Sequence, residues 1–162
     1  MDTTEQARSI TKAERLFLIA QAIAEETPKF FVALGEGAGN LRSNAFMGEL
    51  QERAKSTFGR NYSEAKLCGD NKLAVDFYFP EEETVVEVAG MLSAPNSEYE
   101  KDIFKCLLAQ EKGATIHKLV FIAKPGAAKV QNQPGRLAIA PFVLSHFNIQ
   151  IIVEELVDPT LA

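Results

Sequence analysis

Two acidic residues interrupt consecutive apolar segments of the sequence. Asp76 lies within LAVDFYF (73–79) and Glu87 lies within VVEVA (85–89). A lone carboxylate is costly to bury, so two acids in adjacent core-like segments need a common explanation. A shared divalent cation provides one, because Mg²⁺ prefers carboxylate oxygens and removes their mutual repulsion. The pattern therefore predicts a metal site, with two alternatives: acids that face solvent on an exposed sheet face, or acids paired with a structural Lys or Arg.

The surrounding residues predict the elements that would position this pair. Residues 73–79 and 84–89 are rich in aromatic and β-branched residues, and the short link between them favours an antiparallel hairpin. After the hairpin we expect a helix and a strand, then a second helix and strand, at residues 97–112, 116–123, 135–147 and 149–155. Strand–helix–strand connections favour parallel neighbours. The sequence thus predicts an α/β fold with a mixed sheet and helices on both sides.

Two further helices are expected before the hairpin. In the first, at 10–26, Thr11 and Glu14 have the spacing of a capping box. The second, at 43–58, repeats apolar residues every four positions and stops at a glycine. The glycines of 35–40 between them either bind phosphate or form a flexible connection. They follow a helical segment and lack a Gly-Lys-Ser/Thr ending, which favours the connection.

The order helix–strand–strand–helix–strand across residues 43–123 resembles the catalytic core of the PD-(D/E)XK nuclease superfamily. The segments that carry the resemblance are VDFYF, VVEVAG, NSEYEKDIFKCLLAQEKG and HKLVFIA. The resemblance implies a restriction endonuclease-like mixed β-sheet flanked by helices. In that interpretation residues 1–162 form a single domain, in which 43–155 are the nuclease-like core and 1–42 an N-terminal helical segment packed on it.

One position departs from the family pattern. The family has Lys two residues after the second acid, where this sequence has Ala89. Some family members take the cation from the following helix, which here offers Lys101 and Lys105. The helical period predicts that Lys101 borders a buried stripe containing Tyr99 and Ile103, while Lys105 points further out. Each lysine could equally be a solvated surface residue.

The resemblance implies metal-dependent hydrolysis of DNA phosphodiester bonds, the reaction of an endonuclease. Asp76 and Glu87 would hold Mg²⁺ or Mn²⁺, and Glu49 on the preceding helix would be an additional ligand. Glu52 competes for that role, and a surface position is the alternative for both. The helix lysine would orient or deprotonate a water and stabilise the transition state. The alternative function, favoured by Ala89, is a catalytically inactive nuclease-like domain that acts as a binding or regulatory module.

The charge balance limits how DNA could be bound. The formal net charge is −5, which argues against a protein that coats nucleic acid with a pervasive basic surface. Phosphate contacts would have to come from a local set of basic residues. The candidates are Arg42, Arg53, Lys55, Arg60, Lys66, Lys124 and Lys129. Because the chain is small for sequence-specific cutting by a monomer, a homodimer or larger complex is the expected assembly.

The remaining features are those of an ordinary globular protein. Apolar residues make up 46% and charged residues 24% of the 162 positions. Cys68 and Cys106 share no metal-ligand spacing and are predicted to be packed, reduced thiols. The first residues lack a basic segment followed by an apolar run, and no run of 18 apolar residues occurs. A cytoplasmic protein that does not contact the membrane is the expectation.

Overall fold

The computed structural model describes residues 8–31, 38–69, 73–89 and 98–161. The helices are α1 (Lys12–Glu26), α2 (Ala38–Phe58), α3 (Glu98–Glu111), α4 (Ala127–Gln131) and α5 (Ile139–Phe147). The strands are β1 (Ser63–Ala65), β2 (Val75–Phe79), β3 (Thr84–Val88), β4 (Lys118–Ala123) and β5 (Gln150–Glu155). Short 3₁₀ helices occur at Pro28–Phe31, Pro80–Glu82, Arg136–Ala138 and Pro159–Leu161.

The strands form one mixed sheet in the order β1-β2-β3-β4-β5. The β1–β2 and β2–β3 pairs are antiparallel, whereas the β3–β4 and β4–β5 pairs are parallel. The predicted hairpin is therefore confirmed, and so are the parallel neighbours expected from the strand–helix–strand connections. The mixed α/β class that the sequence predicted is the class observed.

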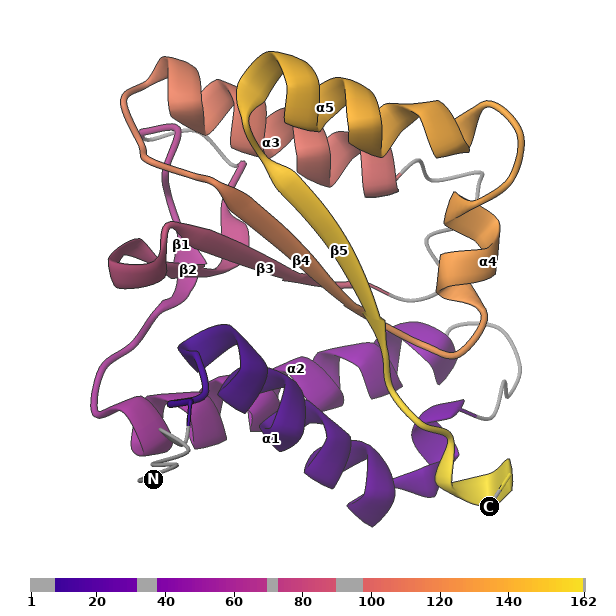
Figure 1. Ribbon diagram of the computed structural model, residues 1–162. Coiled ribbons are helices and arrows are strands. Elements are labelled where there is room, and N and C mark those ends of the chain that lie inside the picture. The colour runs from indigo at the N-terminus through magenta and orange to yellow at the C-terminus, as the bar shows by residue number, and fades with distance from the viewer. Residues whose placement is uncertain (1–7, 32–37, 70–72, 90–97, 162) are drawn as a thin grey trace, which may run out of the picture.

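Helices cover both faces of the sheet (Figure 1). α1 and α2 lie on one face, where Leu16, Leu50 and Phe77 belong to one buried apolar cluster. α3 and α5 lie on the other face, over a second cluster that includes Val85 and Phe121. Alternation along β3, β4 and β5 separates the two clusters, because successive side chains point to opposite faces.

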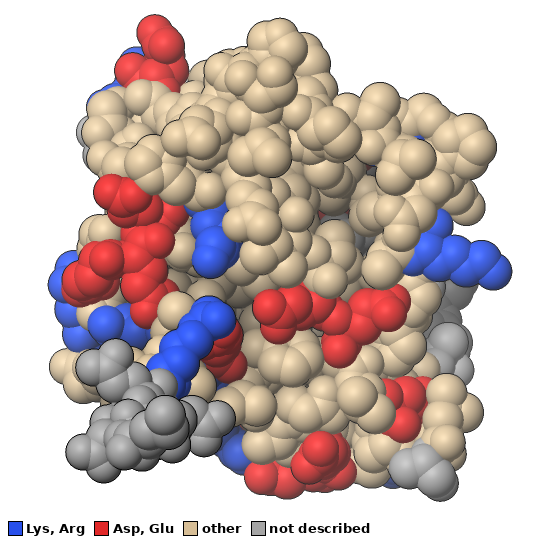
Figure 2. Space-filling model, viewed as in Figure 1, with Lys and Arg blue, Asp and Glu red and all other residues tan. Residues whose placement is uncertain are grey.

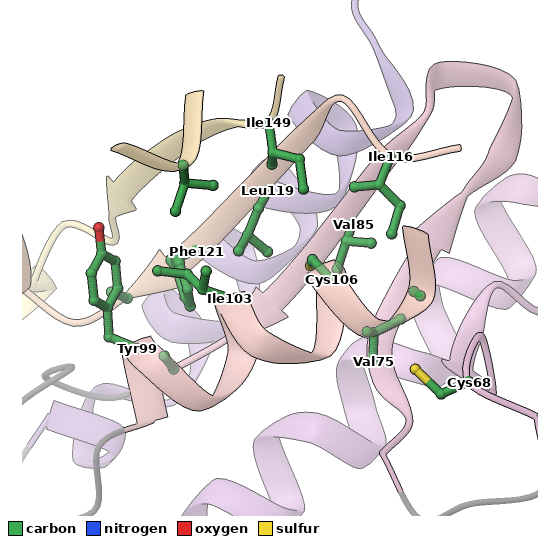
Figure 3. Packing of buried hydrophobic residues seen from close by; sticks show 14 of the residues in the cluster. Cys68, Val75, Val85, Tyr99, Ile103, Cys106, Ile116, Leu119, Phe121 and Ile149 are labelled. Atoms are coloured by element: carbon green, nitrogen blue, oxygen red, sulfur yellow. The ribbon is translucent and has the colours of Figure 1, made fainter. Parts of the chain in front are cut away.

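The packing of α3 differs from the sequence expectation. Its buried residues are Tyr99, Ile103, Lys105, Cys106 and Ala109, and Figure 3 shows Tyr99, Ile103 and Cys106 directed at the sheet. Phe104, which the apolar pattern of the helix predicts to be buried, is instead 55% exposed. The small side chains of Cys106 and Ala109 belong to the buried face, so this face is rotated toward Lys105 relative to the predicted stripe.

The N-terminus of α1 is as predicted. The Thr11 side chain accepts a hydrogen bond from the Glu14 backbone N–H, and the Glu14 carboxylate accepts one from the Thr11 backbone N–H, at 3.1 and 2.7 Å. This reciprocal capping box satisfies two backbone donors that the first helical turn leaves free. It also fixes where the helix begins.

The structure differs from the prediction at the start of α2 and in two additional elements. α2 begins at Ala38 rather than residue 43, so residues 38–40 of the glycine segment are helical, and residues 35–37 lie outside the described residues. β1 and α4 were not predicted. β1 is three polar or small residues long, and its central Glu64 has a φ of 51°, a conformation that hydrophobic periodicity does not reveal.

No described helix is both long and apolar enough to cross a membrane. Cys68 and Cys106 are both buried, as the sequence predicted.

Candidate active site

The hairpin places Asp76 and Glu87 side by side. Phe77 pairs with Val86 in the β2–β3 register, and the next step along the hairpin puts Asp76 opposite Glu87. The Asp76 backbone N–H lies 3.3 Å from Glu87 Oε2, and the Val88 N–H donates to Asp76 Oδ2 at 2.8 Å. Both carboxylates therefore belong to the sheet face that α3 covers. The expectation that the two acids share one site holds geometrically.

A lysine from α3 meets the pair. Lys105 Nζ lies 2.7 Å from Glu87 Oε1 and 2.8 Å from Asp102 Oδ1, and it donates to the Ala74 carbonyl oxygen at 3.1 Å. Three oxygens, from the loop before β2, from β3 and from α3, thus surround one ammonium group. Lys105 ties the helix to the hairpin at the point where the strands carry their acids.

The group is buried from solvent. The side chains of Glu87, Lys105 and Asp102 are 3%, 8% and 13% exposed. Burial and the nearby Asp76 and Asp102 charges raise the pKa of Glu87 well above its usual range, against the lowering effect of Lys105. Burial also raises the pKa of Asp102. Burial acts against the Lys105 charge, but Glu87 and Asp102 outweigh it and raise the pKa of Lys105, which is therefore a cation at neutral pH.

The group carries an excess of negative charge. Three carboxylates and one ammonium give a formal charge of −2 when all are ionised (−3 and +1), which favours protonation of the buried acids or binding of a further cation. Glu87 Oε1 already faces a cation of this chain, because the Lys105 ammonium lies 2.7 Å from it.

The donor set suits Mg²⁺ in a limited sense. Mg²⁺ is commonly held by one or two carboxylates and keeps several waters, which Asp76 and Glu87 could provide for. Among residues 8–31, 38–69, 73–89 and 98–161, however, no group of three or more His, Cys, Asp or Glu is arranged to hold a metal ion. A metal here would rely on the two hairpin acids and on water.

Glu49 is not brought to the pair. It lies on α2, in the layer on the other side of the sheet (Figure 1). Its carboxylate accepts a hydrogen bond from Arg53 Nε at 2.7 Å, and its side chain is 50% exposed. Arg53 also pairs with Glu26 of α1, so Glu49 belongs to a surface network that joins the two helices. Glu52, its competitor, lies on the same helix.

The order of the two candidate lysines is the reverse of the prediction. Lys101 is exposed, whereas Lys105 is buried and reaches Glu87. The cause is the rotation of α3 described above. Asp102 is a member of the site that the sequence analysis did not identify, although its i,i+3 spacing from Lys105 on a helix was a usable signal.

Three of the basic residues suggested for phosphate contact have partners within the described part of the chain. Arg53 and Arg60 are paired with Glu49 and Glu81, and Lys124 Nζ lies 4.4 Å above the centre of the Phe30 ring. The Arg42 side chain lies outside the described residues. On the face drawn in Figure 2, basic and acidic side chains are interspersed.

No protein-family model matches the sequence, and no significant match was found among curated proteins or solved structures.

Proposed function

We propose that the protein is a metal-dependent nuclease of the restriction endonuclease-like class that hydrolyses DNA phosphodiester bonds. The observation that carries the proposal is the position of Lys105. Its amine reaches Glu87 from α3, on the sheet face shared with Asp76, and so provides the cation that Ala89 cannot. A hairpin with two acids, a following helix with a lysine, and a parallel strand after it complete the arrangement.

Each residue has a distinct task in this proposal. Asp76 and Glu87 hold Mg²⁺ or Mn²⁺, which when bound lowers the pKa of a water and neutralises charge that develops on the phosphate. Lys105 remains protonated at neutral pH, because the neighbouring carboxylates raise its pKa. It therefore acts as a fixed positive charge and hydrogen-bond donor beside the reacting phosphate, and it is not the base that removes a proton from water.

The second candidate is a catalytically inactive nuclease-like domain that binds nucleic acid or protein. The observation that favours it is the enclosure of Lys105, whose side chain is 8% exposed with three oxygens within 3.1 Å. An ammonium already surrounded by oxygens in the folded chain has no donor left for a substrate unless it moves. In this interpretation the group is a structural ion cluster that joins α3 to the hairpin.

Cleavage of labelled single-stranded, duplex and branched DNA with Mg²⁺ or Mn²⁺ tests the proposal. Asp76→Asn keeps an oxygen that can accept the Val88 N–H but loses the negative charge. We expect it to lower the cleavage rate by about 100-fold or more, the scale seen when one essential electrostatic group is removed. Glu49→Gln, in the opposite layer, is the matched control and should keep the wild-type rate.

A binding measurement separates the two candidates. If Mg²⁺ binds at the hairpin acids, a concentration of 100 times its Kd stabilises the folded state by about 2.7 kcal/mol, visible as a rise in Tm that Asp76→Asn loses. A Tm rise without cleavage of any substrate would favour the inactive domain. Cleavage that survives in Asp76→Asn and in Glu87→Gln would overturn the nuclease proposal.

A further inference from the structure

The outer surface of the layer formed by α3 and α5 is strongly apolar. α5, with the sequence IAPFVLSHF, contains no Asp, Glu, Lys or Arg. Five large apolar side chains are exposed on or beside it: Phe104 (55%), Leu137 (58%), Phe142 (53%), Leu144 (49%) and Phe147 (37%). Figure 2 shows a broad uncharged region over α5. We refer to these five residues together as the α5 face.

The α5 face contains a hollow as well as projections. A groove of about 440 Å³ between α3 and α5 is lined by apolar residues and by Glu100, which is paired with Arg136. Phe104 of α3 and Leu144 of α5 are exposed on the two helices that line this groove. A patch that carries both a projection and an apolar hollow can pair with a copy of itself across a two-fold axis.

The exposed area is on the scale of a dimer interface. A large aromatic side chain presents about 150–250 Å², so five large side chains that are about half exposed contribute roughly 400–600 Å². A standard interface buries about 800 Å² on each partner, with an apolar centre and a polar rim. The α5 face thus supplies more than half of one side of such an interface. It also equals the largest apolar patch of a typical monomer, about 300–600 Å², which is often functional.

The charges favour a second copy of this chain as the occupant. Because α5 is uncharged, a two-fold axis across it brings no like charges together at the centre. At the rim, Arg136 Nη2 lies 3.5 Å from Glu100 Oε1, so that pair is neutralised within one chain. A nucleic acid would need basic residues there, and a membrane surface favours helices flanked by Lys and Arg. α5 has neither.

We propose that the protein forms a two-fold symmetric homodimer through the α5 face. Sedimentation equilibrium of the full chain, over a concentration range that spans the micromolar region, tests this. We expect wild type to have twice the mass of one chain at high concentration. Phe142→Asp places a charge in each half of the interface and should weaken dimerisation at least tenfold. Leu18→Asp is the matched control, since Leu18 is also 55% exposed but lies on α1, in the opposite layer.

A charge pair at Leu144 makes the test independent of any loss of folding in Phe142→Asp. Leu144→Glu and Leu144→Lys should each be monomeric alone, and mixing them should restore a dimer. A wild-type chain that is monomeric at every concentration would overturn the proposal. The α5 face would then be a candidate binding surface for a different protein. A dimer weakened equally by Leu18→Asp and Phe142→Asp would overturn the choice of face. Failure of the nuclease proposal would change none of these masses.

Discussion

Replacement of Lys105 by methionine is expected to lower the free energy of unfolding by about 3–5 kcal/mol near pH 8. Methionine fills most of the volume of the lysine stem, so the change removes the charge without a large cavity. What remains is the Glu87 and Asp102 carboxylates, 3% and 13% exposed, without the ammonium that lies 2.7 and 2.8 Å from them. Loss of one partner from a buried ion pair costs about this amount, because the other charge stays buried and uncompensated.

The stability lost in Lys105→Met should depend on pH. The pKa of Glu87 determines whether this loss increases or decreases as the pH falls. Burial and neighbouring carboxylates hold that pKa above the value of about 4.5 expected in the unfolded chain, and removal of Lys105 raises it further. A group with a raised folded pKa contributes stability that is present below the unfolded pKa and is lost as the pH rises through the folded pKa. The deficit of Lys105→Met relative to wild type should therefore be smaller near pH 5 than near pH 8.

Urea unfolding followed by circular dichroism at the two pH values measures both effects. Lys101→Met is the matched control, because Lys101 is on the same helix, four residues earlier, and is exposed. It should change the free energy of unfolding by no more than about 0.5 kcal/mol. The reasoning would be refuted if both variants were equally stable near pH 8. A deficit of Lys105→Met that grew on acidification would refute the pH argument.

Three further outcomes follow from individual contacts. Asp102→Asn should destabilise the protein by about 1–3 kcal/mol in urea unfolding, less than Lys105→Met, because Lys105 keeps its ion pair with Glu87; an equal or larger loss would contradict this order. Thr11→Ala removes one half of the capping box and should cost about 0.5–2 kcal/mol, seen as a lower Tm, whereas an unchanged Tm would show that the cap contributes nothing. Burial raises the pKa of the Cys106 thiol, so at pH 8 this thiol should react with a disulfide reagent only after denaturation; rapid reaction in the native protein would disprove its burial.

The sequence predicted the hairpin and the meeting of its two acids because these depend on local pattern. Asp76 and Glu87 are anomalies within apolar strands, and the short connection leaves little choice of register. The start of helix α1 was predictable for a similar reason, since its capping box consists of two residues three positions apart. In each case the information lies within a dozen neighbouring residues.

The identity of the site lysine was not predictable in the same way. The sequence analysis placed the buried stripe of α3 through its large residues, which made Lys101 the better candidate. The structure instead buries the small Cys106 and Ala109 and exposes Phe104. Which face of a helix is buried depends on the shape of the sheet below it. Hydrophobicity alone does not determine how the helix is rotated about its axis. Glu49 was placed at the site by resemblance only, and its local partner is Arg53.

The small residue at position 89 and the buried position of Lys105 are structurally related. Residue 89 lies two positions after Glu87, so both point to the same face of the strand. Ala89 is 8% exposed and packs in the cluster that contains Ile103 and Cys106, the residues that flank Lys105 on α3. A lysine at position 89 would have to place its long stem in this buried cluster, which alanine fills with one methyl group. The cation comes from the helix instead, where Lys105 reaches Glu87 at 2.7 Å.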